Sequence, residues 1–505
     1  MEEINLSERE RVLLIGTYDL GHQPFGLASP AAWLCEAGFQ VDCLDLSRSE
    51  LDTAQVAGAT VVAFYVPMHT ATRLALDVLP VVRDINPTAR VCFYGLYGQA
   101  NVAHLAAMGV DAVISGEFEA ELVRFVDHPD PELLVGSGNF VGPDAVAVGI
   151  TPLDRLRFRV PDRSGLPPLA EYARLASGAE RRVVGYTEAT RGCRHMCRHC
   201  PIPPVYGGKL RVVQVDVVLS DIAAQVAAGA EHITFGDPDF FNAPAHALRV
   251  VETLHARHPT VTYDVTIKIE HLLRHQLLLP TLARSGCLFI TSAVESIDDT
   301  VLGYLDKGHT RLDFIAAVAL CARAGVVLNP TFVAFHPWLT RATLLETFEL
   351  LDDLHIVGSV APIQMTTRLL VPEGSLLLDL PELRGTFGPF DREKLSYPWW
   401  HRDPRIDDLQ VSFERLVALD ARHGVSRQET FDRLWRVAGG EPPPRVDQQQ
   451  DDVPQFLEPW FCCSEPVGEL LTGWREPGRD TDPVIDRPPD TRAVPLPTPA
   501  FQRIG

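Results

Sequence analysis

The sequence has no long apolar run and a shortage of positive charge. None of its 505 residues lies in a stretch approaching the roughly 20 apolar residues of a membrane-spanning helix, and its acidic start, Met-Glu-Glu-Ile-Asn, is unlike a signal peptide. Lys and Arg number 45 against 66 Asp and Glu, which gives a formal charge of −21. This charge argues against a nucleic-acid backbone or an anionic membrane as the main partner. We therefore expect a cytoplasmic protein that binds neither nucleic acid nor a membrane.

No repeat at a fixed period is apparent. The composition is otherwise that of a globular protein, with 46% hydrophobic and 22% charged residues, and the length predicts two to four domains. The ten cysteines include two tight clusters, which indicates metal or redox chemistry and not a disulfide framework.

Residues 1–150 alternate short apolar runs with helical patterns. This alternation predicts a parallel sheet wrapped by helices, an open doubly wound (Rossmann-like) α/β domain. A ligand would lie beyond the carboxyl ends of the strands, near residues 16–26. The expected strands are 12–16, 41–46, 61–66, 91–94 and 112–115, and the expected helices are 30–37, 71–85 and 99–108.

A second alternation occupies residues 182–375, after a linker at 151–181. Its six strand–helix units predict a partial, TIM-like (βα)6 barrel with the chemistry at the carboxyl ends of the strands. The expected strands are 183–187, 232–236, 261–267, 288–293, 326–334 and 363–370, and the expected helices are 215–228, 245–258, 272–285, 312–324 and 342–354.

The chain beyond residue 375 has a looser pattern. Residues 376–440 predict a mainly helical region, with helices at 406–423 and 428–437. Residues 441–505 contain Pro-Pro-Pro and Gln-Gln-Gln runs and end in a stretch rich in Pro, Asp and Arg. They predict a tail that packs as extended chain or stays mobile.

Three cysteines, Cys193, Cys197 and Cys200, follow the first expected barrel strand in the spacing CxxxCxxC. Thiolates so close in sequence can converge on one inorganic centre. Zinc would need a fourth ligand in a structural site, or three ligands plus water in a catalytic one, and His195 or His199 could supply nitrogen. An iron–sulfur cluster suits the same thiolates. Residue types alone leave both centres open.

The position of this loop resembles that of the radical S-adenosylmethionine (radical SAM) superfamily. The resemblance implies that the three cysteines hold a [4Fe–4S] cluster, whose fourth iron is chelated by the amino and carboxylate groups of SAM. The family usually has an aromatic residue before the third cysteine. Here that residue is His199, which can still stack on adenine.

Four further positions match the family more loosely. Gly236 and Asp237, after the second barrel strand, stand where relatives have a Gly-Gly-Glu run that binds the SAM amino group; the alternative is a plain strand-end turn. Glu295 lies in Ala-Val-Glu-Ser, similar to the Gly-x-Glu-Ser of relatives, where the Glu contacts SAM. Lys268 ends the third strand and could face the cavity, or it could be a solvated lysine.

The N-terminal domain resembles the B12-binding-type domain of the cobalamin branch of the superfamily. Residues 10–125 match it in order and length, and residues 399–410 resemble that branch's C-terminal region. The Asp-x-His-x-x-Gly signature that supplies an imidazole to cobalt is missing, and His22 has the wrong offset. The resemblance allows cobalamin as a cofactor, but we favour a retained scaffold domain.

Cys462 and Cys463 are adjacent in the tail. Neighbouring Cα atoms lie about 3.8 Å apart, below the usual disulfide range, so the pair is expected to be a dithiol suited to a soft thiophilic atom. The alternative is two small buried residues beneath Trp460 and Phe461. The run Cys-Cys-Ser-Glu-Pro resembles the tail of CUAEP/CCAEP-tail radical SAM proteins, in which selenocysteine can replace one cysteine.

The CCAEP-tail group includes an enzyme of arsinothricin biosynthesis. The resemblance implies transfer of the 3-amino-3-carboxypropyl group of SAM to trivalent arsenic, with arsenite held by the dithiol and an electron donor such as flavodoxin or ferredoxin. One alternative is a cobalamin-dependent radical SAM methylase or another natural-product tailoring enzyme. An alternative of another class is a non-enzymatic thiol protein that binds a metal.

Overall fold

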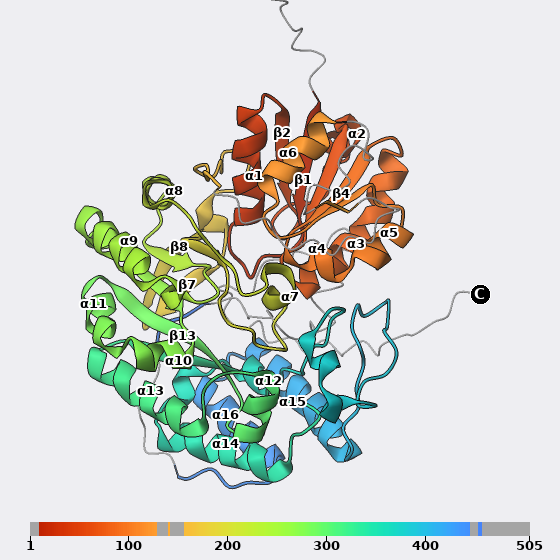
Figure 1. Cartoon of the computed structure of the whole chain (residues 1–505). Helices are drawn as coiled ribbons and strands as arrows, with labels where there is room; N and C mark the ends of the chain where they lie inside the picture. The colour runs from red at the N-terminus through yellow and green to blue at the C-terminus, as the bar shows by residue number, and fades with distance from the viewer. Residues whose placement is uncertain (1–9, 129–139, 142–155, 445–452, 457–505) are drawn as a thin grey trace, which may run out of the picture.

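A computed structural model describes residues 10–128, 140–141, 156–444 and 453–456. Cys462 and Cys463 lie outside these residues. Figure 1 shows the N-terminal domain at one end of the molecule and the half-barrel with the C-terminal helices at the other. Among the described residues, no helix is long and apolar enough to cross a membrane.

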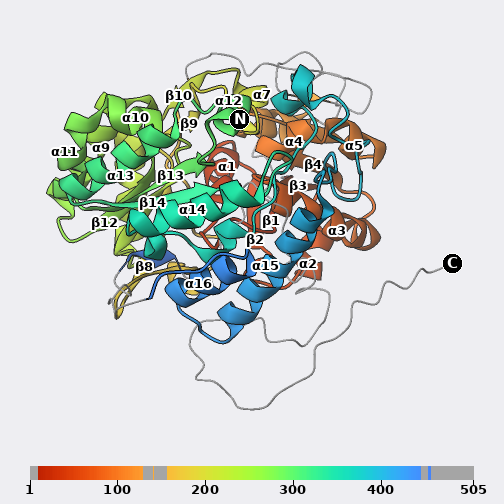
Figure 2. The ribbon, with the colours of Figure 1, turned by 90° about the horizontal axis from the view of Figure 1, so that it is seen from below.

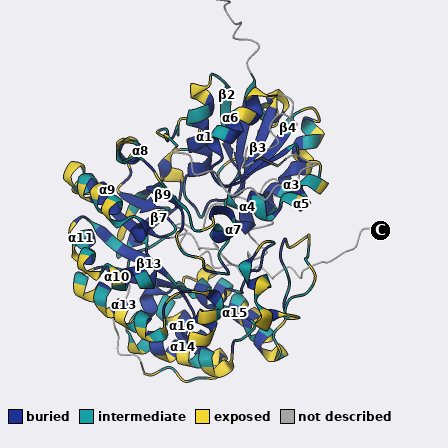
Figure 3. Cartoon of the chain, viewed as in Figure 1, coloured by how far each residue is buried: buried dark blue, intermediate teal, exposed yellow. Residues whose placement is uncertain are grey.

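The N-terminal domain is the expected doubly wound α/β domain. Its strands are β1 (Arg11–Gly16), β2 (Gln40–Asp45), β3 (Val61–Tyr65), β4 (Arg90–Tyr94), β5 (Ala112–Ile114) and the short antiparallel β6 (Phe140–Val141), in the order β2-β1-β3-β4-β5-β6. Its helices are α1 (Phe25–Glu36), α2 (Thr53–Gly58), α3 (His69–Ile85), α4 (Leu96–Ala100), α5 (Val102–Ala107) and α6 (Glu119–Asp127). The central strands β1, β3 and β4 are buried on both faces because helices cover both (Figure 3).

The helix predicted over 99–108 is divided into α4 and α5. Asn101 separates them with a non-helical backbone (φ −127°), and its side-chain amide donates to the carbonyl of Tyr97. A side-chain bond of this kind competes with the helical ladder.

The second sheet curls into a half-barrel. Its order is β14-β13-β12-β11-β8-β7-β15, from β7 (Arg174–Ser177), β8 (Glu180–Thr187), β11 (His232–Phe235), β12 (Thr262–Thr266), β13 (Cys287–Glu295), β14 (Val327–Phe332) and β15 (Gln455–Phe456). Its outer helices are α8 (Val215–Ala227), α9 (Pro244–Arg257), α10 (Ile269–Arg274), α11 (Leu279–Arg284), α12 (Asp299–Leu305), α13 (Arg311–Ala324) and α14 (Arg341–Asp353). The helix predicted at 272–285 is interrupted by the 3₁₀ turn η5 (Gln276–Leu278).

The prediction of a sixth barrel strand over residues 363–370 is wrong. This region begins with the 3₁₀ helix η7 (Pro362–Met365) and makes only one parallel bridge, between Phe335 and Arg368. Side chains bind the end of β14 instead: Gln364 Oε1 accepts from the Phe332 amide at 3.2 Å, and Thr367 Oγ1 donates to the Phe332 carbonyl. These bonds replace a backbone ladder, so the half-barrel has five parallel strands, β8 and β11 to β14.

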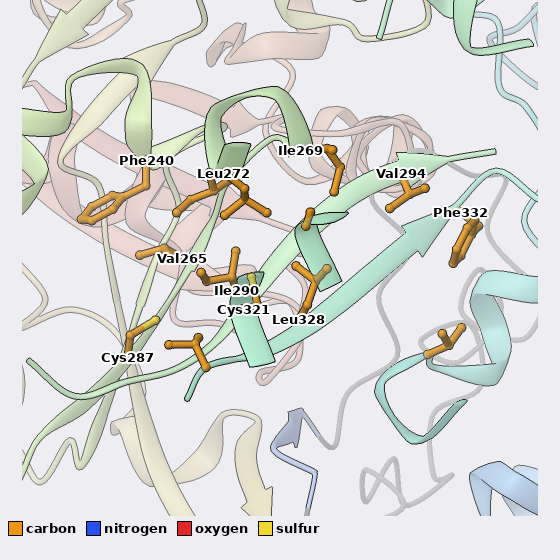
Figure 4. Packing of buried hydrophobic residues seen from close by; sticks show 14 of the residues in the cluster. Phe240, Val265, Ile269, Leu272, Cys287, Ile290, Val294, Cys321, Leu328 and Phe332 are labelled. Atoms are coloured by element: carbon orange, nitrogen blue, oxygen red, sulfur yellow. The ribbon is translucent and has the colours of Figure 1, made fainter. Parts of the chain in front are cut away.

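The strands of the half-barrel alternate their side chains between two faces. Ile233, Val265, Ile290 and Leu328 point outward into an apolar core shared with the helices, as the close-up of this core shows for three of them (Figure 4). The inner face carries polar side chains, including His232 and Asp264, which are 3.0 Å apart. This alternation leaves a polar interior beneath the carboxyl ends of the strands.

Two helices complete the molecule, as predicted. Helices α15 (Pro404–Arg422) and α16 (Arg427–Val437) lie beside α14 (Figure 2), where Phe413, Phe431 and Trp435 surround Phe348. The remaining short helices are the 3₁₀ turns η3 (Leu169–Glu171), η6 (Val357–Ser359), η8 (Leu376–Asp379) and η9 (Pro381–Leu383).

Candidate active site

The three cysteines lie between β8 and β11, directly after a second, short strand. The short strand β9 (Thr190–Gly192) pairs with β10 (Leu210–Val212), and α7 (Ile202–Tyr206) follows the cysteines. Gly192 turns the chain with φ +74°, and a Cβ there would lie 2.5 Å from the Lys209 carbonyl oxygen. Only glycine fits this turn without displacing backbone.

Zinc and an iron–sulfur cluster place different demands on the three thiols. One tetrahedral zinc ion, with Zn–S bonds of about 2.3 Å, needs sulfur atoms about 3.8 Å apart. Within the described residues, the one group of three or more His, Cys, Asp or Glu ligand atoms gathered within 4.8 Å is that of His195, Asp239 and His271. The three Sγ atoms therefore do not all lie within 4.8 Å of one another. Thiolates of this kind are the usual ligands of iron–sulfur clusters.

Asn242 fixes the first cysteine. It ends the 3₁₀ turn η4 (Phe240–Asn242); its Nδ2 lies 3.5 Å from Cys193 Sγ and its Oδ1 accepts from the Arg194 amide. Burial raises the pKa values of the Cys193 and Cys200 thiols. Binding of a soft metal centre must therefore displace their protons.

Glu295 and His199, chosen from separate parts of the sequence, lie together beside this loop. His199 Nε2 is 3.0 Å from Glu295 Oε1, and Lys307 Nζ is 3.3 Å from the same oxygen. Burial would raise the pKa of Glu295, but Lys307 and His199 lower it to about 2. The carboxylate is therefore charged and fixed, with φ +69° at the end of β13. Lys307 was not predicted as a site residue, although it lies in a polar Asp-Lys-Gly-His run directly after α12.

Gly236 and Asp237 directly follow β11. Both residues hold neighbouring backbone segments in place. The Gly236 amide donates to the Thr187 carbonyl, and a Cβ at Gly236 would overlap the Tyr186 ring. Asp237 accepts from the Ala189 amide and from Thr190 Oγ1, which ties β11 to the strand before the cysteines. Burial raises the pKa of Asp237 to about 7. Contacts of either residue with SAM remain a prediction.

Lys268 is buried and takes part in a hydrogen-bonded chain. Its Nζ lies 3.2 Å from His195 Nδ1, and His195 Nε2 lies 3.1 Å from Asp239 Oδ2, which is also 2.8 Å from His271 Nδ1. Since the Lys268 ammonium donates to Nδ1, Nε2 carries the His195 proton and donates to Asp239. The Lys268 ammonium already donates to the group of His195, Asp239 and His271. We therefore interpret this group as one that stabilises the cysteine loop and not as a metal site.

Arg191 connects the cysteine loop to the N-terminal domain. Its guanidinium is buried and contacts Glu119 at 2.7 Å, Glu117 at 3.2 Å and Glu188 at 2.6 Å. Burial raises the pKa of Glu117 to about 7, although Arg191 opposes the shift. The sequence alone could not pair Glu117 with Arg191, because the two residues are 74 positions apart.

The carboxyl ends of the N-terminal strands are filled by the protein's own side chains. Tyr18, Met68 and Tyr97 form one apolar cluster above the point where the strand order reverses between β1 and β3. Beneath it, the Tyr65 ring packs directly on Gly26, and Tyr94 donates to the Gly26 carbonyl. A corrinoid bound at this place would have to displace these side chains.

The half-barrel and its three-thiolate loop define a class of protein, an iron–sulfur enzyme that works at the carboxyl ends of barrel strands. Residues 187–351 match the Radical SAM superfamily model, and they include all three cysteines and Glu295. Residues 187–351 therefore form a radical SAM domain, the kind of domain that holds a [4Fe–4S] cluster and binds SAM.

Curated relatives match parts of the chain. The bacteriochlorophyllide d C-12(1)-methyltransferase of Chlorobaculum tepidum is 28% identical over 26% of this chain and 28% of the relative. The C-8(2)-methyltransferase of the same organism is 26% identical over 40% of this chain and 47% of the relative. The chain thus spans less than half the length of each of these relatives.

Solved structures share the two-domain fold. The cobalamin-dependent radical SAM enzyme OxsB with aqua-cobalamin bound aligns with a TM-score of 0.62 and 14% identity over 80% of this chain and 66% of OxsB. The radical SAM methyltransferase TsrM of Kitasatospora setae aligns with a TM-score of 0.54 and 18% identity over 69% of this chain and 73% of TsrM. At identities this low, the alignments show only that the fold is shared.

Proposed function

We propose that the enzyme transfers the 3-amino-3-carboxypropyl group of SAM to trivalent arsenic held by Cys462 and Cys463. The observation that carries the proposal is the tail sequence Cys-Cys-Ser-Glu-Pro, which differs by one residue from the CCAEP motif. A soft arsenic centre prefers thiolates. The substrate would be arsenite, and the electrons would come from a flavodoxin- or ferredoxin-type donor.

In this proposal, Cys193, Cys197 and Cys200 hold the cluster, which supplies an electron to SAM. His199, Glu295, Lys268, Gly236 and Asp237 would contact SAM, as the resemblance to the family implies. Cleavage of the γ-carbon–sulfur bond consumes one electron and releases methylthioadenosine. Formation of the arsenic–carbon bond with loss of one hydroxide as water consumes a second electron and a proton, and arsenic stays trivalent.

The test is anaerobic incubation of reconstituted protein with dithionite, SAM and arsenite, followed by mass spectrometry. Methylthioadenosine and an arsenic-bearing amino acid are expected in equal amounts. Formation of 5′-deoxyadenosine alone, indifferent to arsenite, would refute the proposal. The paired variant Cys462→Ser/Cys463→Ser is expected to retain its cluster absorbance and lose the arsenic product.

A second candidate is cobalamin-dependent methylation. It is favoured by the shared two-domain fold, since OxsB and TsrM are both described with cobalamin bound. It is disfavoured by the filled carboxyl ends of β1, β3 and β4. Uptake of hydroxocobalamin in a one-to-one ratio would decide for it; failure of the protein to retain cobalamin through gel filtration would decide against it.

A further inference from the structure

The cysteine loop presents different side chains to its two sides. Cys193, Cys197 and His199 are buried, with at most 9% of each residue exposed, whereas Arg194 and Met196 between them are exposed. Met196 is 42% exposed, although methionine is usually buried in folded proteins. The outer side of the loop is therefore a surface only one loop thickness from the buried thiols.

This outer side is basic in an acidic chain. From residue 189 to residue 215 the sequence has five Lys or Arg and no Asp or Glu, although the whole chain carries a formal charge of −21. Only one of the five, Arg191, is buried among carboxylates. The other four are at least partly exposed: Arg194, Arg198, Lys209 and Arg211.

The turn before β10 continues this surface. A Cβ at Gly208 would lie 3.5 Å from Met196 Sδ and 3.8 Å from the Arg194 carbonyl oxygen. A larger side chain at this position would therefore lie against Met196 and cover it. Lys209 follows directly, so the cysteine loop and the turn form one surface. Figure 2 shows β10, α7 and α12 along one edge of the molecule.

Arg198 fastens this surface to the end of α12. Its amide donates to the Leu305 carbonyl at 2.9 Å, and its Nη1 donates to the carbonyls of Gly303 and Tyr304 at 3.0 Å each. Its Nη2 lies 3.8 Å from the exposed carboxylate of Asp306. The loop is therefore held in place from its outer side.

The other two basic groups are available to a partner. Arg194 and Lys209 make no ion pair with any other residue that the structure describes. Their charges lie on either side of the exposed Met196 along the chain of contacts through Gly208. We call the surface formed by Arg194, Met196, Arg198 and Lys209 the basic patch.

We propose that the basic patch is the docking surface for an acidic protein that carries single electrons. The need for this donor rests on the proposed function, and the patch itself rests on described residues. Each encounter passes one electron from the carrier to the site behind the loop. The carrier is oxidised and the site is reduced by one electron, and no bond is made or broken at the patch.

A small acidic carrier fits the patch better than a nucleic acid or a membrane does. A long polyanion meets a wide surface, and the negative charge of the rest of the chain repels it. Electron-transfer encounters, by contrast, bury less than about 1,200 Å². Opposite charges raise their association rate, and a flexible methionine supplies an apolar contact that adapts to the partner.

The first test measures binding of a fluorescently labelled bacterial flavodoxin, as the acidic probe, to the reconstituted enzyme without arsenite. Fluorescence anisotropy at low ionic strength gives the Kd. Arg194→Glu/Lys209→Glu is expected to bind at least about tenfold more weakly, and the difference should shrink as salt screens the charges. Arg194→Lys/Lys209→Arg keeps both charges and should bind like the wild type.

Arg284→Glu/Arg323→Glu is the matched control, because it changes the net charge by the same amount. These two exposed arginines lie in the last turns of α11 and α13, on the side where strands β13 and β14 begin. The Kd of this control is expected to stay within about twofold of the wild-type value. Equal weakening in the two Glu variants would overturn the proposal, and so would wild-type affinity in Arg194→Glu/Lys209→Glu.

The rate of SAM cleavage then separates docking from damage to the site. With dithionite as the reductant, Arg194→Glu/Lys209→Glu is expected to cleave SAM at the wild-type rate. With NADPH, flavodoxin reductase and flavodoxin, the rate should fall about tenfold. Equal losses with both reductants would contradict a docking role. If the wild-type protein makes no arsenic product, the proposed function fails, and the flavodoxin titration still decides whether the patch binds an acidic carrier.

Discussion

At the scale of single residues, the site depends on side chains that the backbone holds in one place. Gly192 must turn the chain immediately before Cys193, and Glu295 holds a left-handed backbone at the end of β13. A non-glycine residue with positive φ is uncommon, and such strain persists only where its surroundings impose it. For Glu295 the surroundings are Lys307 and His199.

Gly192→Ala is expected to destabilise the protein and to lower its iron content. The left-handed backbone costs about 1–2 kcal/mol with any side chain, and the contact with the Lys209 carbonyl adds to this cost. Gly325→Ala is the matched control, since Gly325 has φ +75° and an open space around its Cβ. Iron analysis and thermal unfolding measure both effects. Equal losses in the two variants would contradict the role of the contact.

Lys307→Met is expected to cost about 3–5 kcal/mol in the cluster-free protein, because it leaves a buried carboxylate without its ammonium partner. The double variant Glu295→Gln/Lys307→Met removes both charges and should regain most of this stability. It should still bind SAM more weakly than the wild type. Denaturant unfolding measures stability, and calorimetric titration of the reconstituted protein measures SAM affinity. A double variant no more stable than Lys307→Met would contradict a charge pair.

At the scale of elements, local patterns predicted the parallel strands and most helices. The apolar runs at β3 and β13, for example, are unambiguous because both faces of these strands are buried. The predicted strand at 363–370 failed because side chains of Gln364 and Thr367, and not a neighbouring backbone, satisfy the end of β14. The periodicity of a sequence cannot show which groups form hydrogen bonds with the edge of a strand.

Only those residues of the candidate site that belong to a recognisable motif could be predicted from the sequence. The cysteine spacing identified the cluster loop, and the resemblance singled out His199 and Glu295, which the fold brings to 3.0 Å. Lys307 and Asn242 could not be predicted, because their roles depend on contacts across 12 and 49 residues of chain. The strand β15 was not predicted, because two residues are too short to give a strand pattern.

Arg191 belongs to the element scale because it joins β9 to the loop before α6. Arg191→Met is expected to cost about 3–5 kcal/mol, since it removes the guanidinium that contacts the buried carboxylates of Glu117, Glu119 and Glu188. Cluster content should fall as well, because Arg191 is two residues before Cys193. Arg274→Met, in an exposed pair with Glu270, should cost less than about 0.5 kcal/mol. Denaturant unfolding with iron analysis distinguishes the two, and equal costs would contradict the buried cluster.

At the scale of the whole molecule, polar contacts connect the N-terminal domain to distant parts of the chain. Tyr172 donates to Asp45, and Arg163 lies 2.9 Å from Gln23 and 2.8 Å from Asp221. His69, the first residue of α3, lies with its Nε2 2.6 Å from the Lys394 carbonyl oxygen. The N-terminal domain is therefore built into the enzyme on several sides, which suits a scaffold as well as a cofactor domain.

His69 should make this connection sensitive to acid. Burial lowers its pKa to about 4, the Lys394 carbonyl opposes the shift, and Arg73 adds to it. Because the folded-state pKa lies below the unfolded value of about 6.5, the neutral ring stabilises the fold above pH 6.5, and this contribution is lost as the pH falls toward 4. A shift of this size corresponds to about 3 kcal/mol. His69→Gln keeps an amide donor for Lys394 and does not titrate, so its unfolding free energy should fall less between pH 6.5 and 4. Denaturant unfolding of both proteins across this range measures the difference, and parallel curves would show that His69 takes up no proton on unfolding.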